Sequence, residues 1–165
     1  MPGASSGPRS AISCWCVGWV SPDSSVARLC KMAAVPARGK QVYEAACAAC
    51  HGADLMGVAN IPNMPAGAEL RLIGGRGTLT SQKAVATVES YWPYATTLFD
   101  YIRRAMPFTA PGSLSADEVY AVCAYILGKA KIIDKTAVLD AQTLPRVEMP
   151  NRDGFISDPR PEIFK

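Results

Sequence analysis

The chain has 165 residues, a formal net charge of +3 and 49% hydrophobic residues. This length allows one ordinary domain with extensions, and the sequence has no uncharged apolar run of about 18 residues that could span a membrane. Residues 1–40 carry five basic and one acidic side chain, residues 41–130 six and seven, and residues 131–165 six and six. Because the basic excess lies at the N-terminus, a nucleic-acid-binding surface on the body of the chain is not expected.

Residues 1–36 have the character of a leader. The apolar run "AISCWCVGWV" at 11–20 follows Arg9 and has the length of a signal-peptide core. A true start further along the chain, for example at Met32, is the alternative. The leader also holds three of the six cysteines, Cys14, Cys16 and Cys30, so a disulfide framework in the core is not expected.

The body of the chain begins with helical patterns separated by a long loop. Small and apolar residues recur at helical spacing over 39–50, which predicts a first helix. The following segment is rich in glycine and proline and predicts loop, with a short helix near 82–90. Residues 95–105 predict a further helix, because its apolar residues share one side and Pro107 follows its end.

The clearest helical pattern covers residues 116–127. Ser115 and Glu118 have the spacing of a capping box, and an apolar stripe at i, i+3, i+4 and i+7 follows. Gly128 is placed to end this helix. Cys123 lies on the apolar stripe and is expected to be a buried structural thiol.

Residues 131–165 show neither helical nor strand periodicity and contain four prolines. They are expected to be disordered or to form an extended arm on another surface. Our hypothesis is that residues 140–165 contact a partner subunit.

The stretch "EAACAACHG" at 44–52 carries the strongest chemical signal, with Cys47, Cys50 and the only histidine, His51. A redox dithiol requires a strand-to-helix junction, and no strand is expected before Cys47. A zinc site requires two further ligands, and neither a second C-x-x-C nor a second His exists. The third interpretation is covalent attachment of one haem, in which both thiols bind the porphyrin and His51 ligates the iron.

The second axial ligand of such a haem decides its chemistry. Met106, in a loop before Pro107, is the first choice as iron ligand and Met64 the second. With both axial positions filled, the iron can transfer electrons but cannot bind a substrate. An open sixth position would instead make the protein a haem sensor.

The order of helix, "CAACH", Gly/Pro-rich loop, "AMP" and capped C-terminal helix resembles the class I cytochromes c over residues 37–130. The resemblance implies an all-α fold with three to five helices around one covalent haem c, followed by an extended C-terminal arm over 131–165. It further implies that the first and last helices cross, with Gly39 and Tyr43 against Val122 and Tyr125.

The same resemblance implies that an aromatic residue near the haem edge or its propionates is supplied by Trp92 or Tyr94. Arg76, Arg103 and Arg104 are candidates for docking a partner or for pairing with the propionates.

A narrower resemblance covers residues 90–155. The strings "YWPYATTLFDYIRRAMPF", "DEVYAVCAYIL" and "DAQTLPRVEMPNRDGF" are similar to the cytochrome c subunits of periplasmic sulfur-compound dehydrogenases. It implies a periplasmic electron-transfer subunit that is not catalytic alone. Its donor would be a molybdenum-containing sulfite or sulfane dehydrogenase subunit, and its acceptor a downstream cytochrome or oxidase. A free soluble electron shuttle is the alternative.

Overall fold

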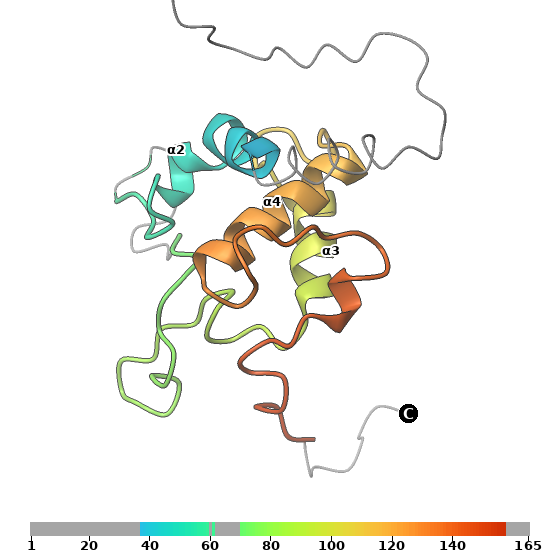
Figure 1. The fold of residues 1–165 in the computed structure, drawn as a ribbon. Coiled ribbons are helices and arrows are strands. Elements are labelled where there is room, and N and C mark those ends of the chain that lie inside the picture. Colours follow the sequence, from blue (N-terminus) through green and yellow to red (C-terminus); the bar gives the residue numbers. More distant parts are fainter. Residues whose placement is uncertain (1–36, 60, 62–69, 158–165) are drawn as a thin grey trace, which may run out of the picture.

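The computed structural model describes residues 37–59, 61 and 70–157, and this part of the chain contains helices, turns and extended connections but no β-strand (Figure 1). The all-α prediction is therefore confirmed. None of the helices within these ranges is long and apolar enough to cross a membrane. The helical segments are residues 37–46, α2 (Ala48–His51), α3 (Ala95–Ala105), α4 (Ala116–Lys129) and the 3-10 helix η1 (Leu144–Arg146).

The first predicted helix forms in two pieces. Residues 37–46 are helical, Cys47 lies in a turn with φ −123° and ψ −37°, and α2 continues from it. The Cys47 amide still donates to the carbonyl of Tyr43 at 2.9 Å, and the His51 amide donates to that of Cys47 at 3.0 Å. The i to i−4 hydrogen bonds therefore pass through the break, and the motif stays fixed to the helix before it.

The helix over 37–46 crosses α4 at very short range (Figure 1). A Cβ atom added to Gly39 would collide with the backbone carbonyl of Ala121 and lie 3.1 Å from the Cβ of Tyr125. One turn further along, the Tyr43 ring packs on Tyr125 with the ring centroids 5.1 Å apart. The predicted contacts of Gly39 and Tyr43 with Tyr125 are thus present, and the absence of a side chain at Gly39 sets the crossing distance.

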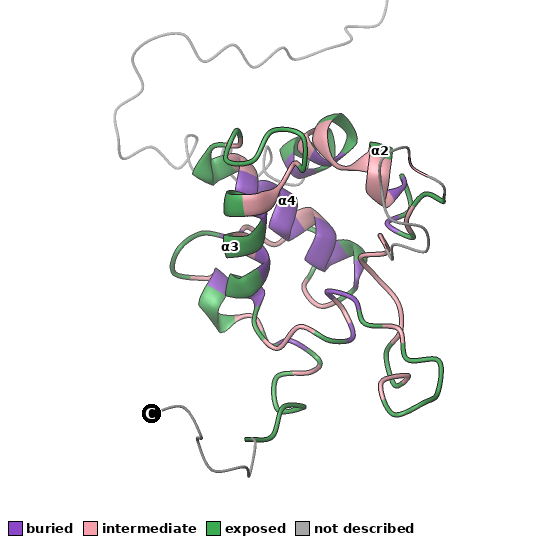
Figure 2. Ribbon diagram, turned by 180° about the vertical axis from the view of Figure 1, so that it is seen from behind, coloured by how far each residue is buried: buried purple, intermediate pink, exposed green. Residues whose placement is uncertain are grey.

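Helix α4 supplies the largest share of the core, with eight of its 14 residues buried, and much of its ribbon is purple (Figure 2). Its capping box is present, because the Ser115 hydroxyl accepts from the Glu118 amide and the Glu118 carboxylate accepts from the Ser115 amide at 2.9 Å. The predicted stop at Gly128 is wrong. Gly128 is a buried helical residue, and the helix ends one residue later, with Ala130 as its C-cap.

Helix α3 has the predicted bounds and covers α4 from one side. Leu98 and Ile102, one turn apart, are 2% and 6% exposed, whereas Arg103 and Arg104 face solvent. This separation of apolar and charged faces explains why the helix packs along one stripe only.

The short helix expected near 82–90 does not form, since this segment consists of turns and extended chain. Its hydroxyl side chains take the hydrogen bonds that a helix would have used. Thr87 Oγ1 donates to the Gly74 carbonyl at 2.7 Å, and Ser90 Oγ donates to the Val85 carbonyl at 2.6 Å. Side-chain hydrogen bonding of this kind competes with helix formation. Here the bond from Thr87 also links the two ends of the loop over 74–90.

The C-terminal arm is ordered and lies on its own domain up to Met149. Leu139, Leu144 and Met149 are each 6% exposed or less and belong to the same core cluster as α3 and α4. The hypothesis that residues 140–165 contact a partner is therefore wrong for Leu144 and Met149, because their apolar side chains are already covered. For Phe155 and Ile156, which are exposed, it stays a prediction, and residues 158–165 lie outside the described part.

Substituting Gly39→Ala is expected to destabilise the protein by about 1–3 kcal/mol, because the new methyl group overpacks a backbone contact. Gly128→Ala is the matched control. At that position a Cβ would lie 3.6 Å from the nearest atom, the Cα of Lys135, so the gain in helix propensity should leave stability unchanged or raise it by up to about 1 kcal/mol. Chemical unfolding measures both, and equal effects of the two substitutions would contradict the close crossing at Gly39.

Candidate functional site

The C-x-x-C-H motif lies at the end of the helix that crosses α4. Cys47 precedes α2, and Cys50 and His51 are its last two residues. All three side chains are half-buried. The Cys50 amide donates to the Cys47 carbonyl at 3.1 Å, so one turn of backbone fixes the spacing of the two thiols. Two thiols held in this way suit attachment to one flat group.

The imidazole of His51 is oriented by a backbone carbonyl from the following loop. Its Nδ1 lies 2.6 Å from the carbonyl oxygen of Leu70. Because a carbonyl oxygen can only accept, Nδ1 must carry the proton and donate it. The lone pair is then on Nε2, which is the arrangement that metal-ligating histidines adopt.

The chain after His51 is closed into a tight turn by backbone hydrogen bonds. The Gly57 amide donates to the His51 carbonyl at 2.8 Å, and the Val58 amide donates to the Cys50 carbonyl at 3.0 Å. Leu55 within this turn is fully buried although its φ is +65°. An apolar side chain holds this unfavourable backbone conformation, so the turn is anchored in the core.

Tyr43 connects this turn to the helix crossing. Its hydroxyl donates to the carbonyl of Gly52 at 2.6 Å, and its ring is fully buried. Burial raises the pKa of the Tyr43 phenol, so the hydroxyl remains a neutral donor. Gly52 directly follows His51, and the hydrogen bond therefore holds the histidine end of the motif against the first helix.

The thiol chemistry argues against a redox dithiol. Burial, and to a smaller extent the nearby Cys50, raises the pKa of the Cys47 thiol to about 11. A reactive dithiol instead needs a lowered pKa.

A zinc site is also unsupported, since the described residues contain no cluster of three or more His, Cys, Asp or Glu side chains that could hold a metal ion. Two thiols held one helical turn apart and one oriented imidazole fit haem attachment.

Met106 lies at the end of α3, where it is the C-cap residue and its amide donates to the Ile102 carbonyl at 3.1 Å. Its side chain is half-buried and packs against the core cluster, as do those of Cys47 and Trp92. Three of the predicted site residues thus border one apolar core. Met64 lies outside the described residues.

The two aromatic candidates differ in their surroundings. Trp92 is half-buried and packs edge-to-face against Tyr101, with ring centroids 5.6 Å apart. Tyr94 is 53% exposed and immediately precedes α3. Of the two, Trp92 has the fixed position that contact with a cofactor requires, and its role there stays a prediction.

The guanidinium of Arg76 has two protein partners. Its Nε pairs with Glu89 at 2.6 Å, and its NH2 donates to the carbonyl of Ala130 at 2.8 Å. Glu89 in turn accepts from the Gly74 amide at 2.6 Å. Arg76 therefore joins the loop over 74–90 to the C-terminal end of α4, and a contact with a propionate stays a prediction.

Three groups in this region have no clear sequence signal. The Leu70 carbonyl orients His51, Glu89 anchors Arg76, and the Tyr43 hydroxyl holds Gly52. A backbone carbonyl cannot be recognised from residue type. The pairing of Arg76 with Glu89 joins two turns of an irregular loop, where no helical or strand period relates the two positions.

A helical domain that presents two fixed thiols and an oriented histidine is the architecture of a haem-attaching protein. The family model for cytochrome c matches residues 36–129, and the chain belongs to the cytochrome c family. It is accordingly an electron-transfer cytochrome with covalently bound haem c, and the C-x-x-C-H position of Cys47, Cys50 and His51 fits that cofactor.

The chain is also similar to a chain in the crystal structure of the sulfane dehydrogenase SoxCD from Paracoccus pantotrophus, with 36% sequence identity and a TM-score of 0.67. The match covers 75% of this chain and 57% of that one, so this chain corresponds to little more than half of the related one. A comparison with curated proteins gives no significant match.

Replacing Tyr43 with Phe is expected to destabilise the protein by about 1–3 kcal/mol, because it leaves the buried Gly52 carbonyl without its donor. Tyr94→Phe is the control, since that hydroxyl is on an exposed side chain. Chemical unfolding of the holoprotein measures the difference, and an equal stability of the two variants would show that the hydrogen bond at Gly52 contributes nothing.

Proposed function

We propose that this cytochrome transfers single electrons through a haem c whose iron is ligated by His51 and Met106. The observation that carries the proposal is the orientation of His51, whose Nδ1 is committed to the Leu70 carbonyl and whose Nε2 is therefore the ligating atom. A haem c bound here supplies a one-electron Fe(III)/Fe(II) couple.

The chain's own residues restrict that chemistry to electron transfer. Cys47 and Cys50 hold the cofactor covalently, and the closed turn after His51 keeps the imidazole in place. Met106 as a second ligand removes the vacant position that a substrate would need, and a thioether favours the reduced state. Trp92 borders the same core and shields the cofactor from water.

We further propose that the electron donor is a molybdenum-containing sulfite or sulfane dehydrogenase subunit. The support is the similarity at 36% identity to a chain of the SoxCD structure, together with the sequence strings over residues 90–155. The protein then works outside the cytoplasm, as covalent haem attachment and that similarity suggest, and passes its electrons to a downstream cytochrome or oxidase.

Substituting Met106→Ala is expected to lower the reduction potential and to let carbon monoxide bind the reduced protein rapidly, because a ligand position opens. Met56→Ala is the control, since Met56 is 40% exposed in the turn after the motif and should leave both properties unchanged. Redox titration and carbon monoxide difference spectra provide the measurements. An unaltered potential in the Met106 variant would exclude Met106 as the ligand, and carbon monoxide binding by the unmodified protein would indicate an open-site sensor.

Iron and molybdenum are expected in roughly equal amounts when the protein is purified gently from its native source. The reason is that one C-x-x-C-H motif binds one iron, and a stable dehydrogenase subunit brings one molybdenum. Elemental analysis of the purified complex measures the ratio. Iron without molybdenum would reject a stable dehydrogenase complex and favour the free electron shuttle.

A further inference from the structure

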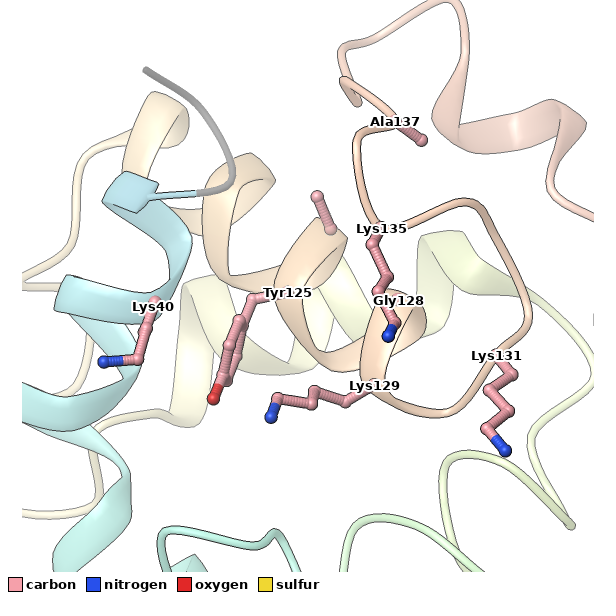
Figure 3. Close-up of a pocket in the computed structure, with 8 residues that line it drawn as sticks. Lys40, Tyr125, Gly128, Lys129, Lys131, Lys135 and Ala137 are labelled. Carbon is pink, nitrogen blue, oxygen red and sulfur yellow. The ribbon is translucent and has the colours of Figure 1, made fainter. Parts of the chain in front are cut away.

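A pocket of about 420 Å³ lies between the helix over 37–46, the last turns of α4 and the chain that follows α4. Its apolar wall includes Ala124, Tyr125 and Gly128. Figure 3 shows the Tyr125 ring standing between Lys40 and Lys129, with Lys135 reaching in from the connection after α4. We call this site the lysine pocket; it is lined by Lys40, Ala124, Tyr125, Gly128, Lys129, Lys131, Lys135 and Ala137.

The lysine pocket concentrates positive charge. It is lined by four of the chain's seven lysines and by no acidic residue. Lys40 has an ion pair with Glu44 at 2.7 Å, and the Lys129 ammonium lies 5.5 Å from the centroid of the Tyr125 ring. Even with Glu44 counted against Lys40 and Asp134 against Lys135, two of the four positive charges remain beside one apolar wall. The site is therefore complementary to negative charge carried beside apolar groups.

The chain's own terminal segments do not match this site. Residues 1–36 carry three basic side chains and one acidic side chain, and residues 158–165 carry two of each. Neither segment brings a net negative charge to the pocket. A negatively charged partner molecule therefore matches the site better than either terminal segment does.

The mixture of charge and apolar surface favours a polypeptide over a nucleic acid. The pocket is a compact concavity in which Lys129 lies over an aromatic ring, and Glu44 and Asp134 are close to its rim, next to Lys40 and Lys135. A phosphate backbone has no aliphatic side chain to cover the apolar wall, whereas an acidic peptide can place carboxylates at the lysines and an apolar side chain on the wall.

We propose that the lysine pocket docks an acidic, partly apolar segment of a partner protein. The interaction requires only the fold and these side chains, so it goes beyond the proposed electron transfer and is independent of which donor the cytochrome uses. Docking would fix the orientation of the partner and raise the rate of encounter at low ionic strength.

The test uses the full-length holoprotein and a fluorescein-labelled peptide of alternating glutamate and leucine, with binding followed by fluorescence anisotropy. The expected result is saturable binding that weakens when salt rises from about 20 to 200 mM, as screening of charge pairs requires. Reversing two charges in Lys129→Glu/Lys135→Glu should weaken binding at least about tenfold. Both side chains are exposed, and the neutral pair Lys129→Gln/Lys135→Gln, which places no carboxylate at the end of α4, should show a smaller loss of the same sign.

The control variant Lys83→Glu/Arg152→Glu changes the net charge equally at two exposed positions outside the pocket, and it should bind as the unmodified protein does. Equal weakening by the control pair would reduce the effect to net charge and overturn the proposal. Equal binding of a peptide with glutamine in place of glutamate would overturn it as well. Displacement of the peptide by an equal concentration of a single-stranded oligothymidine would replace the proposed partner with a nucleic acid.

Discussion

The close crossing of the first helix and α4 is the constraint on which the other features depend. Gly39 lets the two backbones approach until the carbonyl of Ala121 occupies the place of a side chain, and Tyr43 packs on Tyr125 one turn away. Since the i to i−4 hydrogen bonds continue through Cys47 into α2, the position of the crossing also fixes the position of both thiols and of His51. The cofactor-binding residues are thus placed by helix packing and not by a flexible loop.

The same crossing explains how a domain with little regular structure keeps one core. More than 40 residues lie between α2 and α3, and those of them that the structure describes are turns and extended chain. They are held by polar contacts, among them the hydrogen bond from Thr87 to the Gly74 carbonyl and the ion pair of Arg76 with Glu89. The C-terminal arm adds Leu139, Leu144 and Met149 to the same core cluster. A chain of this kind gains its apolar burial from single side chains spread along loops, each contributing about 1–3 kcal/mol relative to exposure.

The sequence predicted those parts that depend on local patterns. The bounds of α3, the capping box of α4 and the approach of Gly39 to α4 follow from spacing or from the family resemblance, and the structure agrees with them. The covalent haem c follows from the C-x-x-C-H string, and the family match agrees with it. The errors arose where residue type alone does not decide the conformation. Gly128 stays helical because the left-handed residue after the end of α4 is Lys131, with φ +56°. Residues 82–90 form turns in which Thr87 and Ser90 bond to the loop backbone. The role of the Leu70 carbonyl, which orients His51, cannot be predicted from the sequence, because every residue has a backbone carbonyl.

One continuous set of contacts joins the lysine pocket to the haem-attachment motif. Lys129 lies over Tyr125, Tyr125 packs on Tyr43, and the Tyr43 hydroxyl holds the carbonyl next to His51. Contact alone does not couple two sites, because coupling requires an element with two arrangements. The structure shows one arrangement, with Tyr43 fully buried at one end and Lys129 exposed at the other. The consequence is geometric: a partner docked at the pocket sits on the same rigid helix pair that carries Cys47 and His51. Since the i to i−4 hydrogen bonds run from the first helix into α2, a segment docked there would have a defined position relative to Cys47 and His51.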